Sequence, residues 1–449
     1  MGRWRAWAGR VAMVGAGVAL ALLALEGAAR WWPGLLYPGA MRTPFGVEQA
    51  TRREQERNPG QARAYPETDS GERPRWYGVP NRTYWHYGME YSTYVQYNAL
   101  GFRDDEHTSR PPGVRRLVVL GDSFVEAREV AFEETFHQQF ERDLNALRPG
   151  SVEVINLGMA GLGTADEYLI LREFGPEFVG EGDVVVLVLY VGNDIWDNSL
   201  RLNTIYRREP TADRPGFVVS EDGELVYVPR YASTAETLSP DELAALDEPA
   251  PSPPAAMPPD RPGPARAILG WLRGHSYLAN VVRDKARGLV EGPPTEVPFE
   301  YGVFAAQPDD AWEEAFDITA RLVVETQAEA AEMGADFLLV LVPARFQVYD
   351  DAWEETLAAY PDMQDGSWDL IQPYALLTEA VTAAGVPTLD LLPVLRACAA
   401  DRPHLYERYG IHWTADGHAL VADVLKHYLG PGLIGVDDSL PVCADGALE

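Results

Sequence analysis

A serine in a short turn motif is the first residue of this sequence with a clear chemical use. An apolar run over residues 117–120 leads directly into Gly-Asp-Ser-Phe at residues 121–124. This order predicts a serine at the turn after a buried strand, with the Ser123 hydroxyl at the carboxyl edge of a sheet. A hydroxyl becomes a good nucleophile only when a base removes its proton and nearby donors stabilise the oxyanion that forms. Gly-Asp-Ser is also a common turn, so the interpretation depends on finding those partners.

Three later segments contain residues that could complete the site. A glycine-rich turn at residues 156–164 contains Gly161, whose backbone N–H could approach a substrate oxygen. Gly-Asn-Asp at residues 192–194 offers the side-chain amide of Asn193 as a second donor. His412 precedes a helical segment near the end of the chain and could act as the base. Each residue also has an ordinary explanation as a turn, a helix cap or a surface histidine, but their order favours one site.

The elements that must position these residues are short apolar runs alternating with helical stretches. The runs that resemble buried strands lie at residues 117–120, 152–155, 183–190, 337–342 and 388–391, and the stretches with helical periodicity lie at 136–147, 166–174, 312–333, 376–384 and beyond 414. This alternation predicts an α/β fold: a doubly wound, flavodoxin-like three-layer sandwich with a central parallel sheet of about five strands. The candidate residues follow successive strands, so they would meet at one edge.

Four regions are expected along the chain. They are an N-terminal anchor or signal segment at 1–32, a stalk with a small aromatic-rich β element at 33–110, the α/β domain at 111–435 with an insertion at about 200–305, and a C-terminal tail at 436–449. Residues 216–228 within the insertion predict a hairpin with an Asp-Gly turn. Residues 249–264 contain eight prolines and favour extended chain, which could serve as a lid or a partner-docking segment, or simply lie on the surface.

The N-terminus carries the pattern of a membrane-targeting segment. Three arginines within the first ten residues precede an apolar or small-residue run at 11–25, which Glu26 ends. The pattern is typical of an uncleaved anchor or a cleaved signal peptide. We favour the anchor because the tryptophan pair at 31–32 suits a membrane interface, and a buried helix is the third interpretation. The domain would then lie in the cell envelope, or be secreted if the segment is cleaved.

The composition argues against nucleic-acid and metal binding and allows one disulfide bond. The formal net charge of -31 disfavours binding to nucleic acid. No His, Cys and carboxylate cluster has ligand spacing, so neither a metal site nor another cofactor is predicted. His418 falls within the last helical stretch, and we interpret it as structural. Cys398 and Cys443 could form one disulfide outside the cytoplasm, or remain two unpaired thiols. The sequence does not identify a protein partner.

The ordered segments resemble the SGNH/GDSL hydrolase superfamily. The family's serine, second-block glycine, Gly-Asn-Asp asparagine and late histidine correspond to Ser123, Gly161, Asn193 and His412. The similarity covers roughly residues 98–430 apart from the insertion, and the lead-in Asn-Ala-Leu-Gly-Phe-Arg at 98–103 looks like membrane-attached bacterial members. The resemblance implies an oxyanion hole made by the backbone N–H groups of Ser123 and Gly161 and the side-chain amide of Asn193.

One feature of the family is missing. The family usually places an aspartate three or two residues before the histidine, and those positions hold Tyr409 and Gly410 here. Loss of such an orienting acid can cost about 10⁴ in turnover. Either a backbone carbonyl orients His412, or Glu407 or Asp390 replaces the aspartate, or the site is weakened and binds its ligand without turning it over.

The resemblance implies a serine hydrolase that acts on ester bonds, or an acyltransferase. Together with the predicted location, it favours an extracytoplasmic esterase or O-acyltransferase that moves an O-acyl group, in the simplest case O-acetyl, of an envelope or secreted glycan through a seryl ester. The expected substrate is therefore an acylated carbohydrate or lipid, with the membrane contacted through the N-terminal segment. The alternatives are a lipase or lysophospholipase type of acyl hydrolase, and a catalytically weakened glycan-binding protein.

Overall fold

The computed structural model describes most of the predicted α/β domain. The described residues are 17, 20–27, 63–64, 77–87, 90–107, 110–206, 216–220, 222–228, 297–364, 366–408 and 410–435. Most of the predicted anchor and stalk, the proline-rich part of the insertion and the C-terminal tail lie outside them. Within the described part of the chain, no helix is both long and apolar enough to span a membrane.

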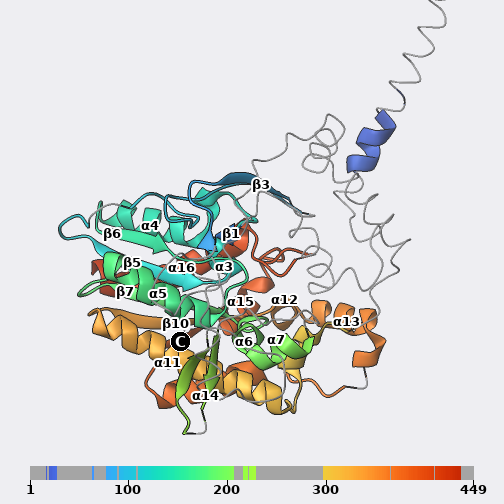
Figure 1. The fold of residues 1–449 in the computed structure, drawn as a ribbon. Helices are drawn as coiled ribbons and strands as arrows, with labels where there is room; N and C mark the ends of the chain where they lie inside the picture. Colours follow the sequence, from blue (N-terminus) through green and yellow to red (C-terminus); the bar gives the residue numbers. More distant parts are fainter. Residues whose placement is uncertain are drawn as a thin grey trace, which may run out of the picture.

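A five-stranded parallel sheet forms the centre of the domain. Its strands are β5 (Arg115–Gly121), β6 (Val152–Asn156), β7 (Val184–Tyr190), β10 (Asp336–Val342) and β11 (Thr388–Asp390). The order across the sheet is β11-β10-β7-β5-β6, and every neighbouring pair is parallel. Figure 1 shows β6, β5, β7 and β10 side by side in this order. All residues of β7 are buried, which explains its unbroken apolar run. The predicted fold class is confirmed.

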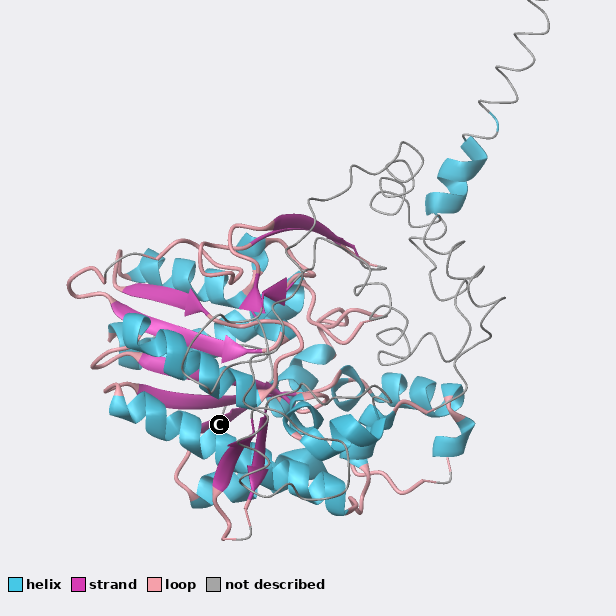
Figure 2. Ribbon diagram, in the orientation of Figure 1, coloured by secondary structure: helices cyan, strands magenta, loops and turns pink. Residues whose placement is uncertain are grey.

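Helices cover both faces of the sheet, as Figure 2 shows. On one face α4 (Phe136–Leu147) packs against α16 (Ala415–Ile434). On the other face α11 (Asp310–Glu332) packs against α5 (Thr164–Phe178) and α14 (Gln372–Ala383). Right-handed crossovers require this arrangement, because the chain moves from β5 outward to β6 and then returns past β5 to β7. That reversal lies between β5 and β7, and the region beyond the carboxyl ends of such strands is the usual ligand position in doubly wound sheets.

Among the described residues, two antiparallel hairpins are attached to this domain, the first where the sequence predicted a small aromatic-rich β element and the second where it predicted a hairpin. The first pairs β3 (Thr83–Tyr87) with β4 (Ser92–Gln96). The second pairs β8 (Gly216–Val219) with β9 (Leu225–Val228) across the Asp-Gly turn. The β8–β9 hairpin packs its Phe217 in a small apolar cluster with residues of α5 and α11. The β3–β4 hairpin lies beside the segment that follows Ser123, and its contacts there are described below.

The remaining elements are short. They are β1 (Arg63–Ala64), β2 (Tyr77–Gly78), α3 (Ser123–Glu126), η4 (Phe132–Glu134), α6 (Asp194–Asn198), α7 (Leu200–Tyr206), η5 (Phe299–Phe304), α12 (Arg345–Val348), α13 (Asp350–Ala359), η6 (Pro361–Met363) and α15 (Leu392–Ala399). Cys398 in α15 is disulfide-bonded. Cys443, the other cysteine of the sequence, lies outside the described residues.

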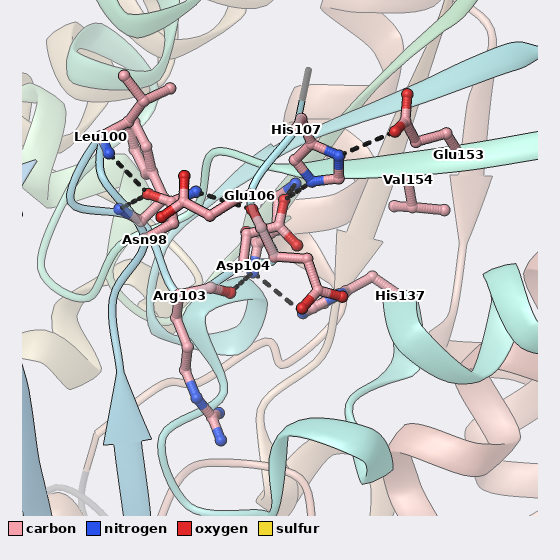
Figure 3. Close-up of polar contacts among 12 residues, drawn as sticks. Asn98, Leu100, Arg103, Asp104, Glu106, His107, His137, Glu153 and Val154 are labelled. Atoms are coloured by element: carbon pink, nitrogen blue, oxygen red, sulfur yellow. Dashed lines mark hydrogen bonds and ion pairs between the residues drawn. The ribbon is translucent and has the colours of Figure 1, made fainter. Parts of the chain in front are cut away.

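The segment before β5 covers the edge strand β6 with a polar cluster, shown in Figure 3. Asp104 accepts a hydrogen bond from the backbone N–H of Asn156 at 2.7 Å. The ring of His107 lies between two carboxylates, with Nε2 2.7 Å from Asp104 and Nδ1 3.1 Å from Glu153. Burial alone would lower the pKa of His107, but these two carboxylates outweigh it and raise the pKa to about 9. This ring therefore carries a positive charge at neutral pH and fastens the segment to the sheet edge.

Candidate active site

The turn after β5 presents Ser123 at the carboxyl edge of the sheet. Asp122 ends the strand, and its side chain accepts a hydrogen bond from the backbone N–H of Phe124 at 2.9 Å. This bond caps the four-residue helix α3, which begins at Ser123, and Ala127 ends that helix in a left-handed conformation (φ 52°). Ser123 is 8% exposed. The strand, the capping bond and the tight helical turn together fix the direction of the serine hydroxyl.

The structure brings Ser123 and His412 together across 289 positions of sequence. Nε2 of His412 lies 2.7 Å from Oγ of Ser123, so the hydroxyl can donate its proton to the ring. Thr414 begins α16 by accepting a hydrogen bond from the N–H of Gly417, which places His412 just ahead of the helix. The His412 ring also contacts Phe124 edge to face, with ring centroids 5.2 Å apart. The helix start and the aromatic contact hold the imidazole over the serine.

The second nitrogen of the same ring faces Glu129. Nδ1 of His412 lies 3.3 Å from Oε1 of Glu129, whose side chain is 3% exposed. Burial alone would raise the pKa of Glu129, but the nearby His412 ring and a contact from His86 outweigh it and hold the pKa well below its usual range. Glu129 is therefore ionised at neutral pH. Hydroxyl, imidazole and carboxylate lie in a row, the arrangement by which a serine is activated for attack on an acyl group.

Glu129 corrects the expectation about what orients His412. The sequence suggested a backbone carbonyl, Glu407 or Asp390, and the structure places none of them in this role. Asp390 instead accepts a hydrogen bond from the N–H of Leu392 at the start of α15. Glu407 is buried beside the active site, and its pKa is raised well above the usual range by burial and by the negative charge of Glu129. It is consequently a neutral acid.

Arg103 holds the loop that carries Glu129. The loop covers residues 127–130, directly after α3. The buried Arg103 guanidinium donates to the carbonyl oxygens of Glu126 at 3.0 Å, of Ala127, and of Val130 at 2.7 Å. Its own segment turns around Asn98, whose side chain accepts hydrogen bonds from the N–H groups of Leu100 and Phe102. The lead-in at residues 98–103 thus has a structural purpose: it shapes the loop that positions the carboxylate.

The glycine-rich turn after β6 lies against α3. The carboxylate of Glu126 accepts hydrogen bonds from Tyr97 at 2.5 Å and from the N–H of Ala160 at 2.6 Å. A Cβ at Gly158 would lie 2.3 Å from the Val125 side chain, so the close approach requires glycine. Gly161 has φ +79°, and among the described residues its N–H has no hydrogen-bond acceptor. This N–H is therefore available to a ligand.

Asn193 belongs to the hydrogen-bond network of the nucleophile. It occupies the position before α6, but its side chain makes no capping bond. Its amide nitrogen lies 3.2 Å from Oδ2 of Asp122 and 3.4 Å from Asp197. The Ser123 hydroxyl lies 3.3 Å from that same Asp122 oxygen. Burial raises the pKa of Asp122 to about 6. The amide therefore donates to the carboxylate that lies next to Ser123, which brings the predicted third donor beside the serine.

His418 has a structural position, as the sequence indicated. Its ring stacks on Phe136 with an interplanar angle of 4°, and Nδ1 accepts a hydrogen bond from the backbone N–H of Phe136 at 3.3 Å. Burial lowers its pKa to about 3, so the ring stays neutral. His418 joins α16 to α4 and does not contact the serine.

Residues 301–432 match the family model of the SGNH hydrolase-like domain of the acetyltransferase AlgX. The matched part contains β10, β11 and His412, and Ser123 lies before it. No curated protein sequence matches the chain.

Solved structures that are similar to this chain include esterases and lipases. The acetyl xylan esterase AlAXEase is 13% identical, with 69% of this chain and 96% of that chain covered and a TM-score of 0.33. The lipase/acylhydrolase from Enterococcus faecalis is 13% identical, with coverages of 70% and 95% and a TM-score of 0.31. A catalytic mutant of Axe2, an acetylxylan esterase from Geobacillus stearothermophilus, is 12% identical, with coverages of 70% and 94% and a TM-score of 0.32.

Proposed function

We propose that this protein is an extracytoplasmic serine esterase or O-acyltransferase that acts on the O-acyl groups of an envelope or secreted glycan. The observation that carries the proposal is the row formed by Ser123, His412 and Glu129, with 2.7 Å and 3.3 Å between successive polar atoms. A hydroxyl with an imidazole on one side and an ionised carboxylate behind the imidazole is suited to acyl transfer through a covalent ester.

The first half of the reaction would form a seryl ester. His412 takes the proton of Ser123 through Nε2 while the serine Oγ attacks the acyl carbonyl carbon. Glu129, facing Nδ1, stabilises the imidazolium that forms and fixes the ring orientation. The backbone N–H groups of Ser123 and Gly161, with the Asn193 amide, would stabilise the oxyanion of the tetrahedral intermediate. His412 then gives the proton to the departing alcohol, and the acyl group remains on the serine.

The second half would reverse these steps with a new nucleophile. His412 takes a proton from water or from a sugar hydroxyl, and the resulting oxygen attacks the carbonyl carbon of the seryl ester. The bond to Ser123 breaks, and its Oγ recovers a proton from His412. Water as the acceptor gives an esterase, and a sugar hydroxyl gives an acyltransferase. For Asn193, oxyanion binding would require exchanging one of its two carboxylate contacts for the substrate oxygen.

Two observations support an acetyl group and an exported location. The matching family model is that of an acetyltransferase domain, which favours O-acetyl among the acyl groups. The N-terminal arginines followed by the apolar run at 11–25 favour export and attachment at the membrane. The proposed substrate is therefore an O-acetylated carbohydrate outside the cytoplasm.

Labelling with a fluorophosphonate tests the proposal. The reagent should attach covalently to the wild-type protein and not to Ser123→Ala, and this substitution should reduce ester turnover by roughly 10⁶. A Ser123-independent adduct, or a loss of turnover below about tenfold, would contradict the assignment of the nucleophile. If no adduct forms, the assignment of Ser123 as an enzymatic nucleophile loses its support, and the alternative of a glycan-binding protein is favoured.

A labelled enzyme can then be assigned to a substrate class. The measurement is acetate release from an O-acetylated polysaccharide compared with fatty-acid release from a lysophospholipid, using Ser123→Ala as the blank. Faster Ser123-dependent acetate release is the expected result. Faster fatty-acid release would replace the glycan substrate with a lipid.

A further inference from the structure

A second imidazole contacts the carboxylate that faces His412. Nε2 of His86, on β3, lies 3.5 Å from Oε1 of Glu129, the oxygen that also lies 3.3 Å from His412. The His86 side chain is 1% exposed. Glu129 therefore lies between a ring that can reach the nucleophile and a ring from a hairpin that precedes the nucleophile in sequence.

Tyr91 fixes the orientation of the second ring. Its hydroxyl lies 3.0 Å from Nε2 of His86, and the two rings stack with centroids 5.0 Å apart and an interplanar angle of 29°. Burial lowers the pKa of His86, which outweighs the opposing effect of Glu129 and leaves the ring neutral at neutral pH. With its proton on Nε2 the neutral ring has one N–H, which faces the Tyr91 oxygen at 3.0 Å and the ionised Glu129 Oε1 at 3.5 Å, so the two oxygens share it as acceptors.

The β3–β4 hairpin is attached to the Glu129 loop at other points as well. The Thr93 hydroxyl donates to the carbonyl oxygen of Arg128, the residue before Glu129. Tyr97, just after β4, donates to Glu126 at 2.5 Å. These bonds hold β4 beside residues 126–128, so that His86 on the paired strand reaches the carboxylate. The contact between His86 and Glu129 is thus one of several contacts that join the β3–β4 hairpin to the loop of residues 127–130 and to α3.

We propose that His86, held by Tyr91, is a positioning residue for Glu129, and that the β3–β4 hairpin is therefore part of the active site. The proposal rests on the proposed function, because it assigns His86 a role through the Ser123–His412–Glu129 row. A buried carboxylate has two oxygens and can rotate. The His86 N–H holds Oε1 at the position from which it faces Nδ1 of His412, and without that donor the carboxylate loses this orientation.

The test is the second-order rate constant for fluorophosphonate labelling of Ser123 in purified full-length variants. His86→Ala should lower the rate constant roughly 10-fold to 100-fold, the loss typical of one hydrogen bond to a charged group. His86→Gln places an amide N–H near the position of Nε2 and should recover most of the rate. Tyr91→Phe, which removes only the hydroxyl, should cause a smaller loss. Tyr84→Phe is the matched control, because its hydroxyl bonds Tyr97 in the same hairpin.

A double substitution separates positioning from a general structural effect. If His86 acts through Glu129, His86→Ala should have no further effect on a protein that already carries Glu129→Ala. An unchanged rate in His86→Ala overturns the proposal. An equal loss with and without Glu129 also overturns it, because His86 would then act by another route. Unchanged labelling of Glu129→Ala alone, or labelling of Ser123→Ala, would instead contradict the proposed function.

Discussion

Two clusters of this domain both combine histidine and acidic side chains, but in opposite ratios. At the edge of the sheet, the His107 ring lies between the carboxylates of Asp104 and Glu153 (Figure 3). Beyond the carboxyl ends of the strands, the Glu129 carboxylate lies between the rings of His86 and His412. In the first cluster, two carboxylates keep one imidazole positively charged. In the second cluster, one carboxylate serves two imidazoles, so the second ring nitrogen of His412 remains available to Ser123.

The difference explains why only one of the clusters can perform chemistry. Both nitrogens of His107 face carboxylates, and its pKa of about 9 keeps it protonated, so it cannot take a proton from a substrate at neutral pH. His412 directs one nitrogen to Glu129 and the other to the Ser123 hydroxyl. Burial and charge pairing are common to both clusters. The second cluster is distinguished by its position beyond the carboxyl end of β5 and by the His412 nitrogen that faces the Ser123 hydroxyl.

Replacing Glu129 should have the largest effect on turnover of the substitutions that leave both Ser123 and His412 in place. Glu129→Gln keeps the size of the side chain but lets an amide N–H face Nδ1, which favours the wrong tautomer of His412. We expect kcat for ester hydrolysis to fall by about 10⁴. Steady-state kinetics with an activated acetate ester measure it.

Glu407→Gln is the matched control for that loss. Glu407 is a buried neutral acid in the same region, so the amide closely mimics its present state. We expect its kcat to change by less than about tenfold. If Glu407→Gln were the more damaging of the two substitutions, Glu407 and not Glu129 would be the acid of the site.

Removing the Asn193 amide should have an intermediate effect. The amide is a donor that would act on the oxyanion, and its side chain does not cap α6. Asn193→Ala should lower kcat by about 10² to 10³, with a smaller effect on KM. Unchanged kinetics would remove Asn193 from the oxyanion hole and leave only the donors of the main chain.

The smallest effect on turnover, and a specific effect on stability, is expected at His107. Its pKa is raised from 6.5 to about 9 in the folded protein, so its stabilising contribution is fully present below pH 6.5 and is lost as the pH rises through 9. At 1.36 kcal/mol per pKa unit, this shift can contribute at most about 3 kcal/mol to the free energy of unfolding. Solvent screening at the partly exposed Glu153 reduces the contribution to about 1 to 2 kcal/mol.

Denaturant unfolding of His107→Gln at several pH values measures this contribution. The wild-type free energy of unfolding should fall between pH 6.5 and 9, and the variant should show a flatter dependence with nearly wild-type kcat at neutral pH. A parallel pH dependence in both proteins would show that His107 is not the titrating group. A large loss of kcat would remove the distinction between the two clusters.

The sheet and its main helices could be predicted because burial leaves a local pattern. Strand β7 is apolar throughout, and α16 shows helical periodicity, so both are visible in short windows of sequence. The short helices α13 and α15 follow strands closely and lack a long periodic stretch, and they were not predicted. Ser123 and His412 were found because each lies at the end of a recognisable element.

Glu129 could not be predicted from the same patterns. The family pattern places the orienting acid close to the histidine in sequence, whereas Glu129 lies six residues after Ser123. Its position depends on the path of an irregular loop, and that path is set by the distant Arg103. A sequence shows a carboxylate at position 129 but not the tertiary hydrogen bonds that direct it. The contact with His86 is hidden for the same reason.

Glu129 supplies the carboxylate that faces Nδ1 of His412. Proton NMR of the protein with ¹⁵N-labelled histidine tests this assignment, since a ring N–H held against a carboxylate gives a strongly downfield resonance. This resonance should be present in the wild type and in Glu407→Gln, and should be lost in Glu129→Gln and in His412→Ala. A His412 resonance that persists in Glu129→Gln and disappears in Glu407→Gln would contradict it.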